Sequence, residues 1–265
     1  MVQLYNSERH LAYLYSVGGF ASLLQIICTA IIWLHWRIVL NTCAGNFQSY
    51  SSYYDERDCG CFLFARDTLT YFVGSSVGYC YWGTFGLVLS LLFCFIFGCF
   101  HVYRVCCKTP KPRSGKMEVR QRSTEIMQLT IEQELQEADD ISPYYWTPAS
   151  IIAAIMVIYS LVHSVMLTYG FFSTCKQYRN RVIKHTLAKG EMVGVLQSRL
   201  SCGAILDFMD YLQEDLSFER RRDYRINTSI PFILSIIACW VVVVCWIAIL
   251  VINVMRYRQS RRVRI

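Results

Sequence analysis

Long apolar runs without any charged residue dominate the pattern of this chain. Each is about as long as the roughly 20 apolar residues with which a helix crosses the hydrocarbon core of a bilayer. Because a backbone in lipid has to satisfy its own hydrogen bonds, the runs are predicted to be helices. The pattern therefore predicts an all-α integral membrane protein, a four-transmembrane-helix bundle in a single membrane domain over 1–265. The predicted spans are about 12–35, 81–103, 149–172 and 230–255.

Three polar segments connect the predicted spans, at about 36–80, 104–148 and 173–229. The middle segment opens with RVCCKTPKPRSGKMEVRQR and the C-terminus ends with RYRQSRRVRI, whereas 36–80 holds only three basic residues. The positive-inside rule therefore predicts that both termini and 104–148 are cytoplasmic, and that 36–80 and 173–229 form lumenal or extracellular loops. The basic stretch ERRRDYR before the last span runs against this orientation.

Composition agrees with the predicted membrane bundle and limits the kinds of binding partner that we expect. Hydrophobic residues make up 54% of the 265 residues and charged residues 17%, which is too apolar for an ordinary soluble domain. The formal net charge of +7 comes with basic clusters beside the spans, without interleaved aromatic residues. We therefore expect the lipid bilayer and protein partners, and no nucleic acid. The oligomeric state stays open.

Six cysteines lie in the two predicted lumenal or extracellular loops, an even set on one side of the membrane. Such a set is typical of structural disulfides in an oxidising compartment. Cys59 and Cys61 are too close in sequence to pair comfortably with each other. Each is expected to reach a distant cysteine, tying the first loop to itself and to the third connecting segment, with the pairing left open. The candidates are Cys43, Cys59, Cys61, Cys80, Cys175 and Cys202.

Two other chemistries compete for Cys59 and Cys61. Zinc needs about four Cys or His ligands, usually in close pairs, and these loops offer no second close pair and no nearby His. A redox-active pair is the other alternative, because neighbouring thiols exchange with substrates, but no thioredoxin-like pattern surrounds it. Structural disulfides are favoured, and no metal or cofactor is expected.

The first loop also has two strand-like patterns. NFQSYSSYY, at 46–54, alternates polar and aromatic positions, and Cys61–Phe64 is a short, bulky apolar run. Together they predict a small sheet pinned by disulfides.

The middle segment carries two features expected on the cytoplasmic side. Cys106 and Cys107 lie directly beside the second span and before a basic run, a setting typical of S-palmitoylation. Two unmodified thiols are the alternative. Residues 123–140 are predicted to form a helix with a thin apolar stripe. This helix is either solvated or a docking site for a cytoplasmic partner.

Polar residues are scarce inside the predicted spans, and none of them is Asp, Glu, Lys or Arg. Ion-coupled transporters usually need ionisable groups there, so the pattern argues against one. His163 is the one candidate functional group in a span, although a hydrogen-bonded structural histidine is favoured. The sequence contains no P-loop, H-E-x-x-H, G-x-S-x-G or paired catalytic carboxylates. No catalytic residue is therefore expected.

Several short features of the chain resemble the transmembrane protein 179 family. They are Cys61-Phe62-Leu63-Phe64, Cys80 before the leucine-rich start of the second span, Cys175 past the third span, and Ser201-Cys202. The resemblance implies a four-span membrane protein and no settled biochemical activity. The chain departs from the family in a longer, more basic middle loop, a longer third loop and an arginine tail. Claudins are a weaker comparison, because their Gly-Leu-Trp and cysteine spacing are absent.

These observations favour a non-enzymatic multi-pass protein of the plasma membrane or secretory pathway. Its disulfide-stapled loops would present a partner-binding surface, and the protein would act as an accessory or structural component. One alternative is a subunit of a pore-forming or claudin-like junction assembly. Another is a lumenal thiol-disulfide oxidoreductase that uses Cys59 and Cys61.

Overall fold

The computed structural model describes residues 2–39, 60–67, 72–108, 143–185, 190, 193–194, 202 and 228–262. Most of this described chain is helical, and it contains four helical stretches long and apolar enough to cross a membrane. Each sequence-predicted span lies inside one of them, which confirms a chain built for several membrane crossings. The stretches are Ser7–Trp36, Val77–Cys107, Tyr145–Lys184 and Ser229–Arg258.

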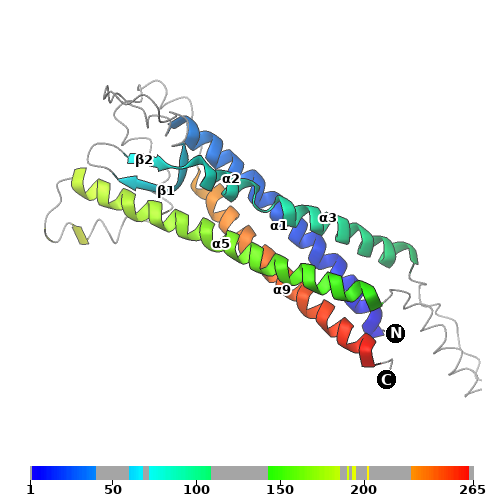
Figure 1. Ribbon diagram of the computed structural model, residues 1–265. Coiled ribbons are helices and arrows are strands. Elements are labelled where there is room, and N and C mark those ends of the chain that lie inside the picture. The colour runs from blue at the N-terminus through cyan, green and yellow to red at the C-terminus, as the bar shows by residue number, and fades with distance from the viewer. Residues whose placement is uncertain are drawn as a thin grey trace, which may run out of the picture. The chain divides into compact units, whose positions relative to one another are not determined.

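A short antiparallel ribbon accompanies the helices, as the strand-like pattern of the first loop predicted (Figure 1). Its strands are β1 (Cys61–Asp67) and β2 (Phe72–Ser75), so the predicted strand at Cys61–Phe64 is confirmed. The other predicted strand, 46–54, lies outside the described residues, as does the predicted helix 123–140. The helical elements are α1 (Val2–Val39), α2 (Val77–Phe85), α3 (Val88–Tyr103), η1 (Arg104–Lys108), α5 (Pro143–His185) and α9 (Ser229–Arg262).

The third span runs further than its apolar pattern predicted. The charge-free run suggested an end near 172, but α5 continues to His185. Past residue 172, the side chains of Thr174, Cys175 and Tyr178 are all buried. Residues three and four apart share one face of a helix, so this extension is amphipathic rather than uniformly apolar. Hydrophobicity averaged along the sequence does not detect this amphipathic extension.

The described chain divides into two compact units. The terminal unit contains 1–19, 92–158 and 244–265, and the ribbon unit contains 20–91 and 159–243. In the terminal unit, Gly18 allows close helix packing, since a Cβ there would lie 3.3 Å from Cys94 Sγ and 3.5 Å from Cys245 Cβ. Small residues let membrane helices approach in this way.

The second span is broken, although its sequence predicts one continuous helix. α2 ends at Phe85, and α3 begins at Val88. The last regular bond before the break joins Gly86 N–H to the Trp82 carbonyl oxygen at 2.9 Å, and the ladder resumes from Leu91 N–H to the Leu87 carbonyl oxygen. Gly86 keeps helical dihedral angles, with φ −57° and ψ −33°, so the break lies in the hydrogen-bond ladder. Backbone groups left without partners at membrane depth are tolerated where other protein groups bind them.

Side chains from two other helices supply that cover within the ribbon unit. Gln25 Nε2 on α1 donates to the Gly83 carbonyl oxygen at 2.8 Å. The Tyr159 hydroxyl on α5 donates to the Gly86 carbonyl oxygen at 2.6 Å. In a continuous helix, both carbonyls would accept backbone N–H groups four residues later. The side chains thus take over bonds that the break removes.

Candidate functional site

The ribbon is anchored in the ribbon unit by what we term the ribbon cluster: Phe62, Leu63, Phe64, Thr174 and Phe232. The first half of β1 is nearly inaccessible, with Phe62 at 2% exposure and Leu63 at 3%. An isolated two-stranded ribbon is at best marginally stable in water. The packing of β1 against helices is therefore what gives this ribbon a fixed position in its unit.

Thr174 on α5 is the polar centre of the ribbon cluster. Its hydroxyl oxygen accepts a hydrogen bond from the Ala65 N–H at 3.1 Å. The same oxygen lies 2.8 Å from the Phe62 carbonyl oxygen and 3.0 Å from the Gly170 carbonyl oxygen, and shares its single proton between them. One side chain thus satisfies a donor and an acceptor of β1 and ties the strand to α5.

Aromatic and aliphatic contacts complete the anchor. The Phe62 ring meets the edge of Phe232 on α9, with ring centroids 5.5 Å apart, and Phe171 lies 4.6 Å from the same ring. Leu63 packs against two glycines, since a Cβ on Gly83 would lie 3.0 Å from its Cδ1 and one on Gly170 would lie 3.4 Å from its Cβ. Larger residues at these two positions would displace the strand.

Phe64 has an unusual backbone conformation. Its φ is +58°, the left-handed region that a bulky residue rarely adopts. The strand pairing is irregular over the same stretch, between Cys61 and Arg66. The Phe64 ring lies 4.9 Å from the ring of Tyr79 and 5.9 Å from that of Tyr169. This irregularity therefore aims an aromatic side chain at two helices, as β-bulges commonly do.

Two cysteine pairs lie at disulfide distance, Cys61 with Cys80 and Cys175 with Cys202. The first closes the ribbon onto the start of α2, and the second joins α5 to the segment that follows it. The Cys61–Cys80 pair ties the first loop to itself, as expected, whereas neither described pair links the first and third connecting segments. Cys43 and Cys59 lie outside the described residues.

Aromatic residues near the ribbon cluster are exposed. Tyr79, Tyr81, Tyr169 and Phe172 have between 43% and 66% of their surface accessible. Tyrosine is enriched where membrane helices meet water and at the centres of protein interfaces. Arg66 on β1 is exposed as well. The ribbon cluster is thus a buried anchor beneath accessible aromatic and basic side chains.

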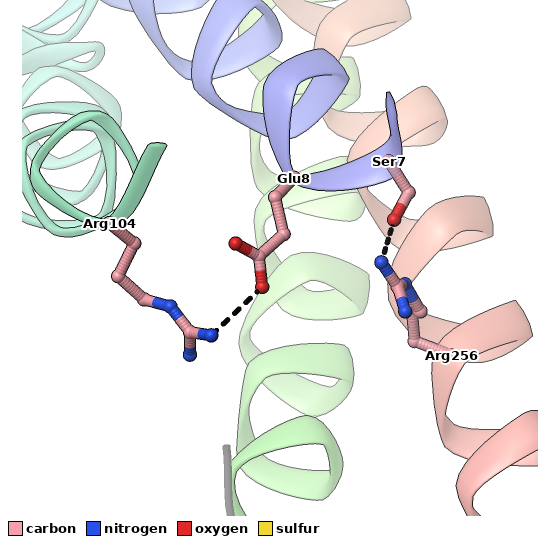
Figure 2. A network of polar contacts seen from close by, with 4 residues as sticks. All are labelled: Ser7, Glu8, Arg104 and Arg256. Atoms are coloured by element: carbon pink, nitrogen blue, oxygen red, sulfur yellow. Dashed lines mark hydrogen bonds and ion pairs between the residues drawn. The ribbon is translucent and has the colours of Figure 1, made fainter. Parts of the chain in front are cut away.

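The terminal unit holds a different arrangement, the charged cluster of Ser7, Glu8, Arg104 and Arg256. Figure 2 shows Ser7 and Glu8 on α1, with Arg104 reaching Glu8 from one side and Arg256 reaching Ser7 from the other. Arg104 Nη2 lies 3.1 Å from Glu8 Oε1, and the two side chains are only 14% and 10% exposed. Charge-assisted bonds of this kind are stronger than neutral ones.

Aromatic rings surround the charged cluster. The guanidinium of Arg256 lies 5.8 Å from the ring centre of Trp146, and that of Arg104 lies 6.0 Å from Phe100. Tyr15 stacks on His101, with centroids 5.6 Å apart. Cation–π contacts lower the cost of holding an arginine away from water. Charged residues from η1, α1 and α9 and the aromatic rings thus form one packed region in this unit.

The predicted acylation candidates, Cys106 and Cys107, are exposed free thiols in η1. His163 is fully buried, beside the break in the second span. Sequence reasoning missed Thr174 and the charged cluster, because both depend on contacts between distant segments. A weak signal existed for the latter, since Glu8, Arg104 and Arg256 each lie within one or two turns of a predicted span end.

Among the residues that the structure describes, no group of three or more His, Cys, Asp or Glu side chains is placed to hold a metal ion. The chain matches no protein-family model, no curated protein and no solved structure. The resemblance to the transmembrane protein 179 family accordingly stays a sequence prediction.

Proposed function

We propose that this chain is a non-enzymatic multi-pass membrane protein that binds a protein partner through the accessible side chains above the ribbon cluster. The observation that carries the proposal is the anchoring of β1. A buried hydroxyl, an aromatic contact to α9 and a cysteine pair all hold one short strand. A surface fixed before binding loses less conformational entropy when a partner docks.

Cysteine placement supports the proposed orientation, with the ribbon facing the lumen or the cell exterior. Along the second span, the paired Cys80 lies near the start, whereas the unpaired, exposed Cys106 and Cys107 lie at the end. Disulfides persist in oxidising compartments and free thiols in the cytosol. We therefore propose that η1 and both termini are cytoplasmic. The protein itself would lie in the plasma membrane or in a membrane of the secretory pathway.

S-palmitoylation of Cys106 and Cys107 is part of this proposal. Their thiols are exposed at the end of a membrane-spanning helix and are followed by a basic run. Acylation would fix this end at the membrane surface. Acyl exchange on the native protein should label the wild type and leave the Cys106→Ser, Cys107→Ser variant unlabelled. An unlabelled wild type would remove this part of the proposal.

The burial of Cys61 counts against the thiol-disulfide oxidoreductase alternative. Exchange requires an accessible sulfur, whereas Cys61 is fully buried and Cys80 is 1% exposed. Cys61 is also paired with Cys80, not with its sequence neighbour Cys59. A structural disulfide is therefore the favoured role of Cys61.

The experiment compares two charge reversals on exposed arginines. Arg66→Glu changes the ribbon surface, and Arg258→Glu changes an exposed position on α9 in the terminal unit. Both variants are expected to fold normally, because neither side chain is buried. Quantitative affinity purification of the full-length chain from its own cells should lose a defined partner set with Arg66→Glu and keep it with Arg258→Glu.

An identical partner set in the wild type and both variants would contradict the proposal. A set lost only with Arg258→Glu would move the binding surface to the terminal unit. Thiol labelling of Cys106 and Cys107 in intact and permeabilised cells, after hydroxylamine has released thioester-bound acyl groups, tests the orientation separately. Labelling of these two cysteines in intact cells would contradict the proposed orientation.

A further inference from the structure

The break in the second span places buried polar groups together inside the membrane-spanning part of the ribbon unit. His163 on α5 lies directly against it, because a Cβ on Gly86 would be 2.5 Å from His163 Nδ1. The imidazole therefore occupies the space that only a glycine leaves free. Its ring also lies 6.3 Å from the ring of Trp82.

The hydrogen bonding of these groups is incomplete within the protein. His163 and Gln25 are both 0% exposed. Among the described residues, neither ring nitrogen of His163 has a hydrogen-bond partner, and Gln25 Oε1 has none. Gln25 Nε2 and the Tyr159 hydroxyl already bind backbone carbonyls. His163 and Gln25, which lie against the break, thus both keep unmet hydrogen-bonding capacity.

The chemistry of the site excludes a bare ion. No Asp, Glu, Lys or Arg occurs in 11–36, 72–103, 146–175 or 228–255, the described stretches that include the break and the residues packed against it. An ion at the break would face no opposite charge, and an unpaired charge in a low-dielectric interior is strongly disfavoured. The available groups are neutral donors and acceptors. These groups suit a small neutral molecule that both donates and accepts hydrogen bonds.

We propose that the helix break at Gly86–Leu87 is an internal water-binding site that completes the hydrogen bonding of His163 and Gln25. Buried waters typically bind two to four otherwise unsatisfied polar groups. In this arrangement the carbonyls freed by the break are bound by side chains, and water serves the remaining atoms of those side chains. The proposed water thus lies at the same place as the break in the second span.

Radiolytic hydroxyl labelling of the full-length protein in lipid nanodiscs tests the proposal, because bound water generates hydroxyl radicals beside the residues that hold it. Trp82 is the reporter and Trp240 its matched control. Their exposures are 37% and 39%, and the Trp240 indole N–H already bonds Thr168 Oγ1 at 3.3 Å. Trp82 should be labelled several-fold faster than Trp240. Equal rates in the wild type would overturn the proposal.

Two substitutions at one position connect the signal to the imidazole. His163→Phe removes the polar atoms and should lower Trp82 labelling to the Trp240 rate. His163→Asn keeps a donor and an acceptor and should preserve most of the difference. Fast Trp82 labelling that survives both His163→Phe and Gln25→Leu would show that the water belongs to other groups, which contradicts the site. If a variant unfolds, the labelling rates of Trp82 and Trp240 in the wild type still test the proposal.

Discussion

The ribbon cluster and the charged cluster hold their helices by different means. Thr174, Phe62 and a cysteine pair fix β1 with neutral hydrogen bonds, aromatic contact and a covalent link. Glu8, Arg104 and Arg256 join α1, η1 and α9 with an ion pair, a hydrogen bond and arginine–aromatic contacts. The first depends on an oxidising environment, and the second depends on both charges being present.

The comparison shows how a chain of apolar helices acquires specific contacts. Lipid is as apolar as leucine, so burying leucine between helices gives little hydrophobic driving force. Geometry, covalent links and polar pairs therefore decide which helices meet. The two clusters are expected to respond to different perturbations. Four experiments, three on the clusters and one on a bond outside them, follow from the largest expected effect to the smallest.

Glu8→Ala should have the largest effect, about 4 kcal/mol lost from the free energy of unfolding, because the largely buried Arg104 loses its carboxylate partner. Unfolding in mixed detergent–SDS micelles measures the change. The double variant Glu8→Ala, Arg104→Met should recover most of the loss, since no buried charge is then stranded. If the double variant is as unstable as the single one, packing rather than charge holds this cluster.

Replacing Cys61 and Cys80 with Ser should lower the unfolding free energy by about 3 kcal/mol, because the link closes a loop with a sequence separation of 19 residues. The same measurement applies. Cys106→Ser with Cys107→Ser is the matched control, since those thiols are free and exposed. Equal stability of the two double variants would deny the link a role in the ribbon cluster.

Thr174→Val keeps the side-chain shape but removes the hydroxyl. We expect a loss of about 2 kcal/mol, because the buried Ala65 N–H loses its acceptor. Thr147→Val, at an exposed position on the same helix, should leave stability unchanged. Amide hydrogen exchange at Ala65 should rise in the first variant only. Unchanged exchange would mean that Thr174 does not hold β1.

The smallest effect concerns the bond from Trp36 Nε1 to Thr228 Oγ1, 3.3 Å long, between α1 and the residue preceding α9. A double-mutant cycle with Trp36→Phe and Thr228→Val should give a coupling energy of about 1 kcal/mol, the usual net value of a neutral hydrogen bond. Additive losses would show that the two side chains act independently. This hydrogen bond would then contribute nothing to holding α1 beside the start of α9.

The apolar runs predicted the four long helices, because a membrane-spanning helix needs only length and the absence of charge. The same criterion hid the break, since Gly86 and Leu87 sit in an unbroken apolar stretch and no proline marks them. The carbonyl groups that the break leaves without backbone partners are bound by Gln25 and Tyr159, which come from other helices. Pairs such as Glu8 with Arg104, or Thr174 with Ala65, join residues far apart in sequence. A single sequence carries no periodic signal for them.

The helix break also has a consequence for the order of assembly. Synthesis proceeds from the N-terminus, so Gln25 enters the membrane before the second span and Tyr159 enters after it. The Gly83 carbonyl meets its donor as soon as the second span arrives, whereas the Gly86 carbonyl meets Tyr159 only after α5 has inserted. The break is therefore finished in two stages. A nascent chain that stops between the second and third spans carries only the first.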